Sequence, residues 1–472
     1  MAVFLLGIAV SWGQTPAAFP QTVNFEGRLT FDDYERLREI PFEVPPGTRR
    51  IELIAATTGR NRRTMVDIGL RGPSGFRGWS GTRLETVQVS AFTATPGYLP
   101  GPIEPGAWAV ILGVPNIRKG SEDTYSISIT LQDTDLPVFS RVIRQGEGWY
   151  AGDLHTHSAH SDGSVTSLGG RRVGGPPHLM FEAAKAAGMD FVTLSDHNTV
   201  AHWLEVDRLQ PYYDTMLLLH GREVTTYRGH ANTVGERRFT DFRLPTPQSS
   251  PAPILREITS TGAFVYINHP LRPDDETCMG CGWNLTDDET LGAVLGVEVV
   301  NGPLAIPNQY GWDAWASWLN RGFRLTAVGG SDEHTPDEPY DYLLGMPTTV
   351  VWARELSEPA IIEGLKSGRV YIRVRGPKGP TLEFNAEVGA ASYPMGAVLP
   401  SASARVRLRA AVGQADGQTL EWIRNGQTVA TDIVRQAVMT HDFDAQPGDW
   451  FSLIVRDALL PTLLSNPIYV AR

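Results

Sequence analysis

The stretch that decides the fold is GDLHTHSAHSDGS, residues 152–164. It begins inside a predicted β-strand, Trp149–Leu154, and carries His155 and His157 two positions apart. In a strand, side chains at positions i and i+2 point to the same face, so these two imidazoles can bind one ion. The stretch therefore predicts a metal site at the end of a strand.

Outward from this stretch, residues 149–375 alternate short apolar runs with helical patterns. A helix is expected to begin at Pro177 and to end before Gly188, because proline is favoured in the first helical turn and glycine after the last. Strands are predicted at Trp149–Leu154, Phe191–Ser195, Met216–Leu219, Phe264–Ile267, Val297–Val300 and Leu325–Val328. Such alternation predicts parallel strands, in a barrel or in an open sheet.

Residues that can bind metals follow these strands. Ten of the 11 histidines lie between His155 and His334. Active sites of parallel α/β folds form at the carboxyl ends of the strands. So many polar groups would be costly to bury without a cation, and a mixture of imidazole and carboxylate suits Zn, Mn or Fe. We therefore expect two or three divalent ions, bound by His155, His157, Asp162, His197, Glu223, His230, His269, Asp332 and His334.

Several neighbouring residues have two interpretations each. Asp196 is expected to orient the adjacent ligand. Arg222 and Arg272 could grip phosphate oxygens or form ion pairs, and Trp283 could line an apolar substrate pocket or belong to the core. Three further histidines are expected to be structural or surface residues: His178, His202 and His220. The predicted catalytic residues are Glu223, Asp332, Asp196 and Arg272.

The flanking regions are predicted to be β-structure, and a chain of 472 residues has room for roughly three domains. In residues 20–135, Ile51, Leu53 and Ala55 fall on one face of a strand, and repeated turn signals predict a β-sandwich. In residues 379–472, Asn425-Gly426 signals a two-residue hairpin, and an Ig-like sandwich is expected. These domains would either contact carbohydrate or the cell envelope, or only support the central domain.

The first ten residues, MAVFLLGIAV, form an apolar run followed by small residues. This pattern is typical of a secretory signal peptide, here within residues 1–18, and predicts an exported protein, periplasmic or extracellular. No Lys or Arg precedes the run, so a buried strand is the alternative. No later apolar run approaches the roughly 18 residues that span a membrane, so no transmembrane segment is expected.

Net charge indicates which partners to exclude, and the two cysteines indicate a possible disulfide. The formal net charge is -11 and no run of Lys or Arg is present, which argues against nucleic acid as a partner. Cys278 and Cys281 are the two cysteines of the chain. In an oxidising compartment they would form a small loop disulfide, and two free thiols are the alternative.

Five motifs, in order, resemble the PHP (polymerase and histidinol phosphatase) superfamily. They are GDLHTHSAHSDGS (152–164), FVTLSDHNTV (191–200), GREVTTYRGHANTVG (221–235), FVYINHP (264–270) and GGSDEH (329–334). The resemblance covers roughly residues 149–375. The GHAN segment, the preceding β-domain and the closing SNPIYV also resemble the CehA/McbA-like metallohydrolases, a branch that includes a carbaryl hydrolase.

The resemblance implies an α/β fold with a distorted (β/α)7 barrel at residues 149–375, which holds up to three metals. It implies a first metal on His155, His157, Glu223 and Asp332, a second on Glu223, His230 and His269, and a third on Asp162, His197 and His334. The chain departs from the family in one turn, where members place a histidine and this sequence has Asp162, with His160 nearby.

These residues predict a metal-dependent hydrolase of a small-molecule ester. Metal binding lowers the pKa of water from about 16 toward about 7, so a metal-bridged hydroxide could attack phosphorus or a carbonyl carbon. A phosphoesterase is the first expectation, because clustered cations complement an anionic substrate. A carboxyl or carbamate ester hydrolase is the alternative that the branch resemblance supports. A non-catalytic metal-binding surface protein is the second alternative.

Overall fold

The structure is a computed structural model that describes residues 18–81, 86–136, 141–276, 278–303, 310–337, 344–400 and 405–472. Apart from its last residue, the predicted signal peptide at residues 1–18 lies outside these ranges. The chain divides into two compact units, Met1–Leu136 and Pro137–Arg472, called here the N-terminal and C-terminal units. None of the described helices is both long and apolar enough to span a membrane.

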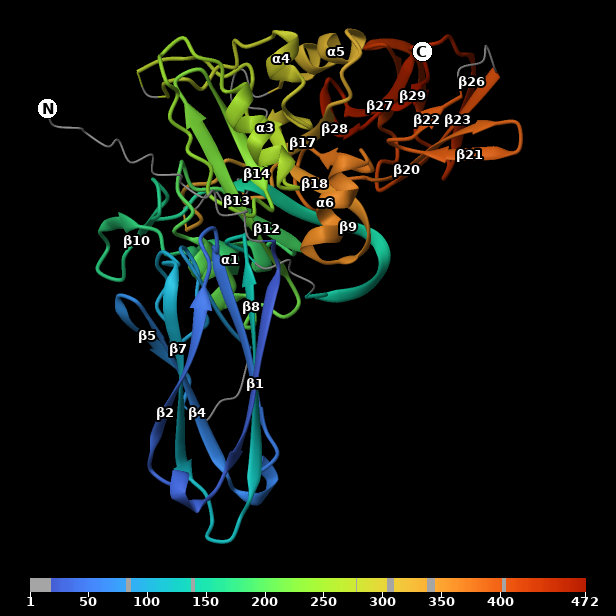
Figure 1. Cartoon of the computed structure of the whole chain (residues 1–472). Coiled ribbons are helices and arrows are strands. Elements are labelled where there is room, and N and C mark those ends of the chain that lie inside the picture. The colour runs from blue at the N-terminus through green and yellow to red at the C-terminus, as the bar shows by residue number, and fades with distance from the viewer. Residues whose placement is uncertain are drawn as a thin grey trace, which may run out of the picture. The chain divides into compact units, whose positions relative to one another are not determined.

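The N-terminal unit consists of two antiparallel sheets over one apolar core (blue to cyan in Figure 1). One sheet has the order β1 (Gln21–Leu29), β8 (Asp123–Gln132), β3 (Arg50–Thr57), β6 (Val87–Ser90). The other has the order β2 (Leu37–Val44), β7 (Gly106–Asn116), β4 (Met65–Gly72), β5 (Gly75–Trp79). Ile51 and Leu53 of β3 share this core with Leu70 and Val110 of the other sheet, as their alternation predicted.

Of seven neighbouring strands in the C-terminal unit, all but β16 carry a predicted ligand or directly precede one. Their order is β17 (Thr326–Gly330), β16 (Gly296–Asn301), β15 (Phe264–Ile267), β14 (Gly229–Val234), β13 (Leu217–Thr226), β12 (Phe191–Leu194), β9 (Arg144–Thr156). The segment after β17 returns to β9, because a single bridge joins Thr156 to Glu333 and the Asp332 amide donates to the His155 carbonyl at 2.9 Å. The segments that follow β9 and β17 therefore lie side by side.

Helices are few among the described residues of the C-terminal unit. They are α1 (Pro177–Ala186), α2 (Trp203–Leu209), α3 (Ala252–Ser260), α4 (Asp288–Leu291), α5 (Trp312–Asn320) and α6 (Glu358–Lys366). The expected alternation of strand and helix is incomplete, because β13 and β14 form an antiparallel hairpin and β14 pairs antiparallel with β15. The described part of the unit is thus mostly β-structure, without the regular (β/α)7 repeat that the resemblance implied.

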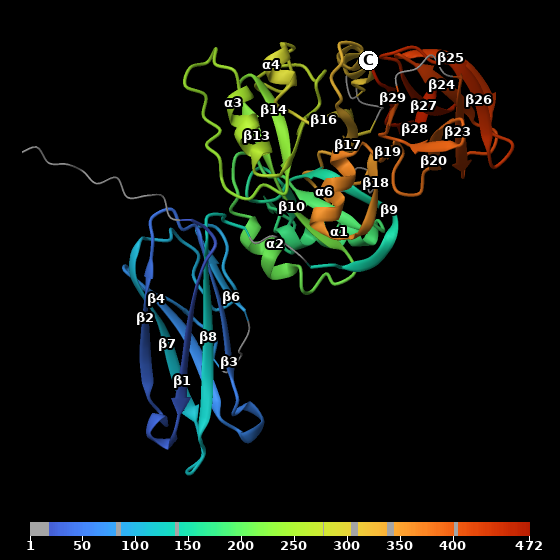
Figure 2. The same ribbon diagram turned by 45° about the vertical axis from the view of Figure 1, so that its right-hand side comes forward.

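The sheet continues without a break into the C-terminal strands (orange to red in Figure 2). Beyond β9 its order is β18 (Thr348–Leu356), β19 (Val370–Arg373), β28 (Leu460–Ser465), β27 (Trp450–Asp457), β24 (Thr419–Arg424), β25 (Gln427–Ile433). A four-stranded sheet shares a core with these strands, in the order β21 (Ala391–Pro394), β20 (Thr381–Val388), β23 (Arg405–Gly413), β26 (Met439–Asp444). The expected hairpin is present, since Asn425 and Gly426 turn β24 into β25 with positive φ angles.

Candidate metal centre

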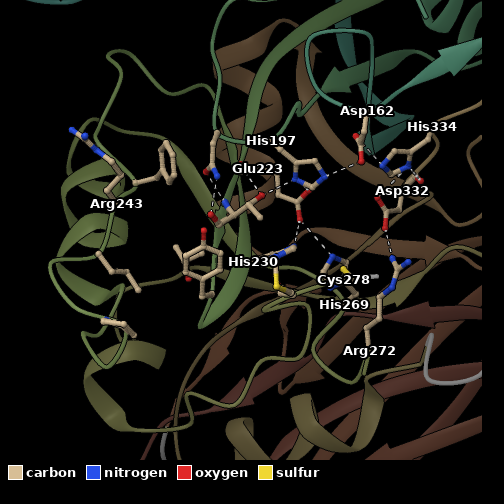
Figure 3. Close-up of a pocket in the computed structure, with 18 of the residues that line it drawn as sticks. Asp162, His197, Glu223, His230, Arg243, His269, Arg272, Cys278, Asp332 and His334 are labelled. Carbon is tan, nitrogen blue, oxygen red and sulfur yellow. Dashed lines mark hydrogen bonds and ion pairs between the residues drawn. The ribbon is translucent and has the colours of Figure 1, made fainter. Parts of the chain in front are cut away.

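A cavity of about 620 Å³ opens where the predicted ligands meet. Seven of the nine line it directly: Asp162, His197, Glu223, His230, His269, Asp332 and His334 (Figure 3). The other two, His155 and His157, are buried behind Glu223 and Asp332. The structure therefore brings all nine predicted ligands into one cluster.

Glu223, on β13, is fully buried at the centre of the cluster. Its Oε2 lies 3.3 Å from Nε2 of His155, 3.4 Å from Nε2 of His157 and 3.0 Å from Nδ1 of His197. Burial opposes ionisation of Glu223, but His197 and His155 outweigh it and hold the pKa of the carboxyl well below its usual range. The effect is mutual: burial lowers the pKa of His197, yet Glu223 and Asp162 raise it to about 10.

The second oxygen of Glu223 faces a different pair of imidazoles. Oε1 lies 3.0 Å from Nδ1 of His230 and 3.5 Å from Nε2 of His269. It also accepts a hydrogen bond of 2.8 Å from the Asn268 amide. One carboxylate thus connects the histidines of β9 and β12 with those of β14 and β15, as a bridging ligand would.

Two aspartates complete the cluster. Asp332 places Oδ1 3.3 Å from Nε2 of His155 and 3.2 Å from Nε2 of His157, while its Oδ2 accepts from Arg272 at 2.8 Å. Asp162 lies between His334 (3.3 Å) and His197 (3.6 Å), as Figure 3 shows. Its side chain is 56% exposed, so this end of the cluster meets solvent.

The backbone at two of these ligands is strained. His269 has a φ of 24° and Asp332 a φ of 58°, a region that residues with a Cβ seldom adopt. Such conformations cost on the order of 1 kcal/mol or more and gather at functional sites. The cost indicates that the fold holds these two side chains in position although the local backbone conformation is unfavourable.

Four imidazoles of the cluster share one arrangement: one ring nitrogen contacts an acceptor outside the cluster's centre, and the other nitrogen faces Glu223, Asp332 or Asp162. The outer contacts are His155 Nδ1 to Glu298 Oε1 (3.0 Å), His230 Nε2 to the Met279 carbonyl (3.2 Å), His269 Nδ1 to the Cys281 carbonyl (3.1 Å) and His334 Nδ1 to the Asp332 carbonyl (2.7 Å). Metal-bound histidines are typically held in this way.

The donor atoms fall into groups of the size that one ion needs. Three groups made of predicted ligands alone have all their donor atoms within 4.8 Å of one another: His155, Glu223 and His269; His155, His157 and Asp332; and His157, Asp162, His197 and His334. Burial and the neighbouring His334 lower the pKa of His157 to about 4, so its ring is neutral. Its Nε2 is buried near Asp332 Oδ1 (3.2 Å) and Glu223 Oε2 (3.4 Å), but neither contact has the geometry of a hydrogen bond. A divalent cation would give this nitrogen a partner.

Glu298, on β16, is a residue of the site that the sequence argument missed. Its Oε1 contacts His155, and its Oε2 accepts from the backbone amide of His269 at 2.9 Å and from Asn301 at 2.9 Å. A single glutamate inside the otherwise apolar run GVEVVN was the available signal. Its side chain is buried and orients two of the predicted ligands.

Of three other residues considered for the site, two do not join the cluster and one lines the cavity. Asp196 faces away from the cavity and accepts from the amide and hydroxyl of Ser158, so it fixes the turn that follows His157. His160 pairs with Glu205 at 2.9 Å and does not join the cluster. Arg272 lines the cavity and forms an ion pair with Asp332 at 2.8 Å, and its role as a phosphate clamp stays a prediction.

Two alternatives are resolved by burial. Arg222 forms a fully buried ion pair with Glu236, with contacts of 2.7 and 2.9 Å, so a phosphate clamp at Arg222 is wrong. Trp283 belongs to the apolar core, and a Cβ on Gly229 would meet its ring at 2.3 Å. The apolar wall of the cavity comes from other residues: Tyr227, Phe242, Leu244, Pro245, Pro247 and Met279.

Comparison with protein-family models finds no match, and comparison with curated proteins finds none either. Among solved structures, the chain is similar to a two-domain protein from Bacteroides vulgatus that contains a predicted PHP-like metal-dependent phosphoesterase, with 21% identity, a TM-score of 0.39 and coverage of 69% of this chain and 96% of that one. It is also similar to PliG, a periplasmic inhibitor of g-type lysozyme from Salmonella Typhimurium, with 16% identity, a TM-score of 0.15 and coverage of 24% and 91%. A glycosyl hydrolase family 2 member from Bacteroides cellulosilyticus gives 10% identity, a TM-score of 0.18 and coverage of 92% and 63%. These likenesses are too distant to assign the chain to a family.

Proposed function

We propose that this chain is a metal-dependent hydrolase and that phosphoesters are its preferred class of substrate. The observation that carries the proposal is the arrangement of four imidazoles (His155, His230, His269 and His334), each held from outside so that its second nitrogen faces Glu223, Asp332 or Asp162. Nine side chains would hold two or three ions of Zn, Mn or Fe: His155, His157, Asp162, His197, Glu223, His230, His269, Asp332 and His334. When bound, these ions would supply Lewis acidity and lower the pKa of a water molecule.

The protein's own residues would bind and orient the substrate. Arg272 lines the same cavity as the carboxylates and keeps Asp332 in place through a contact of 2.8 Å. Positive charge at this wall favours an anionic ester group. Asp162, at the solvent-exposed end, leaves water with access to the cluster.

A second candidate function rests on the apolar part of the cavity wall. Tyr227, Phe242, Leu244 and Met279 line the cavity, so it also suits an uncharged ester with an apolar body. A carboxyl or carbamate ester is the class that fits this wall. Substrate charge therefore separates the two candidates.

The test uses the full chain loaded separately with Zn, Mn and Fe, and measures metal content and turnover on the same sample. The substrates are p-nitrophenyl phosphate, bis-p-nitrophenyl phosphate and an aryl carbamate. Cleavage of a phosphate is expected, and cleavage confined to the carbamate would favour the second candidate. Asp332→Ala is expected to lose metal and turnover, whereas Asp313→Ala, an exposed position on α5, serves as the matched control. Full turnover in Asp332→Ala would exclude the proposed centre, and bound metal without any turnover would favour a binding protein.

We also propose that the protein works in an oxidising compartment outside the cytoplasm. The disulfide between Cys278 and Cys281 supports this, because such bonds persist mainly in exported proteins. Expression with a C-terminal tag and cell fractionation would test it, and a product found only in the cytoplasm would contradict it.

A further inference from the structure

The loop after His269 closes one side of the cluster. Within it, Cys278 and Cys281 are joined by a disulfide, and residues 278–281 are called here the cystine loop. Figure 3 shows Cys278 beside His230 and His269, and sulfur and ring nitrogen atoms of Cys278, Cys281 and His230 lie within 4.8 Å of one another. Because the two sulfurs are bonded to each other, they do not offer thiolates to a metal.

The cystine loop instead presents two backbone carbonyls to two imidazoles. The Met279 carbonyl lies 3.2 Å from Nε2 of His230, and the Cys281 carbonyl lies 3.1 Å from Nδ1 of His269. A carbonyl oxygen can only accept, so each of these nitrogens must carry the proton of the hydrogen bond. In a neutral imidazole the other nitrogen then keeps its lone pair.

The two nitrogens that would bind the ion face a common place. Nδ1 of His230 and Nε2 of His269 both face Oε1 of Glu223, at 3.0 and 3.5 Å. Binding of a metal requires a lone pair on the nitrogen that faces the ion. The two carbonyls of the cystine loop thus select the tautomers that a metal at this position needs.

Three features hold the loop against the cluster. The disulfide closes it, and the Gly280 amide donates to Asp274 at 2.6 Å. Gly280 has a φ of 78°, and a Cβ there would meet the Thr226 carbonyl at 2.1 Å. The loop therefore packs directly on the end of β13, the strand that carries Glu223.

We propose that the cystine loop is a positioning element, whose disulfide keeps the carbonyls of Met279 and Cys281 on His230 and His269 and so sets the affinity of the metal that these two histidines and Glu223 share. The inference rests on the proposed metal-dependent function. It assigns the two cysteines a role at the site without making them ligands.

The test is titration of the metal-free full chain with Co²⁺, followed by visible absorption and elemental analysis. The double variant Cys278→Ser/Cys281→Ser keeps both carbonyls but releases the loop. It is expected to bind one ion about 10- to 100-fold more weakly and to leave the other ions unchanged. Gly280→Ala retains the disulfide but displaces the loop from β13, and the same selective loss is expected. Leu271→Ala, an exposed position outside the cavity in the same segment, should match the wild type.

Unchanged affinity for every ion in both the double variant and Gly280→Ala would overturn the inference. An equal loss of affinity for every ion would also overturn it, because that result indicates that the loop has a general structural role. A wild-type chain that binds no Co²⁺, Zn²⁺ or Mn²⁺ would remove the proposed function itself, and the inference with it.

Discussion

Glu298 shows, at the scale of a residue, how one buried carboxylate orients two ligands. Its oxygens contact Nδ1 of His155 and the backbone amide of His269. In Glu298→Gln one of these acceptors becomes an amide NH2, which cannot accept, so metal affinity is expected to fall about 10- to 100-fold. Isothermal titration with Zn²⁺ measures the change, and Glu257→Gln on the exposed face of α3 is the matched control. Equal affinities in the two variants would contradict this role for Glu298.

His220, which lies outside the cavity, makes the stability of the fold depend on pH. It is buried between Asp207 and Glu358, each 3.0 Å away. Burial lowers its pKa, but these carboxylates raise it from 6.5 to about 9. A raised pKa means that the protonated ring stabilises the fold fully below about pH 6.5, and that this contribution is lost as the pH rises through about 9.

In the wild type, the free energy of unfolding is expected to fall by about 2 to 3 kcal/mol as His220 loses its proton. The variant His220→Asn is expected to lack this fall. Urea unfolding of the metal-free wild type and variant at about pH 6 and about pH 9.5 measures the difference, and His441→Asn controls for loss of an imidazole elsewhere. A wild type and variant with parallel pH profiles would refute the assignment.

At the scale of an element, β13 explains why neighbouring residues have different roles. Glu223 faces the cavity, so Arg222 points to the opposite face, where it pairs with Glu236. Removing one member of a buried pair leaves an unpaired charge, and Arg222→Met is expected to lower the free energy of unfolding by about 3 to 5 kcal/mol. The double variant Arg222→Met/Glu236→Leu should recover most of that loss in urea unfolding. A double variant as unstable as Arg222→Met would show that the ion pair is not the cause.

The elements also show what the sequence could predict. β15 was expected at Phe264–Ile267 and is found there, because this short apolar run follows the turn at Gly262 and ends at the polar Asn268. β14 was missed as a strand, since its buried histidine and asparagine hide the apolar pattern and their hydrogen-bond partners come from distant segments. Register between distant strands is equally invisible: the pairing of Tyr371 with Ser465 joins β19 to β28 and depends on the whole sheet.

The candidate site was more predictable than the fold around it. Ligand residues stand at the ends of strands or just after them, so their positions could be inferred from local patterns, as for His155 and Asp332. Residues that act through another side chain could not be inferred in this way, because the role of Glu298 depends on its contact with an imidazole 143 positions away. The alternation rule would have excluded Arg222 as a clamp once Glu223 was taken to face the cavity.

At the scale of the whole molecule, all nine predicted ligands and their partners lie in the C-terminal unit, Pro137–Arg472. The N-terminal unit has a separate core built from its own two sheets. A chain that begins at residue 137 is therefore expected to keep its metal content and, on any substrate that the full chain cleaves, its turnover within about twofold. Elemental analysis and initial rates at equal protein concentration provide the measurement, and circular dichroism of residues 18–136 alone tests whether the N-terminal unit folds by itself. Loss of metal from the shortened chain, with its β-structure intact, would mean that the N-terminal unit takes part in the site.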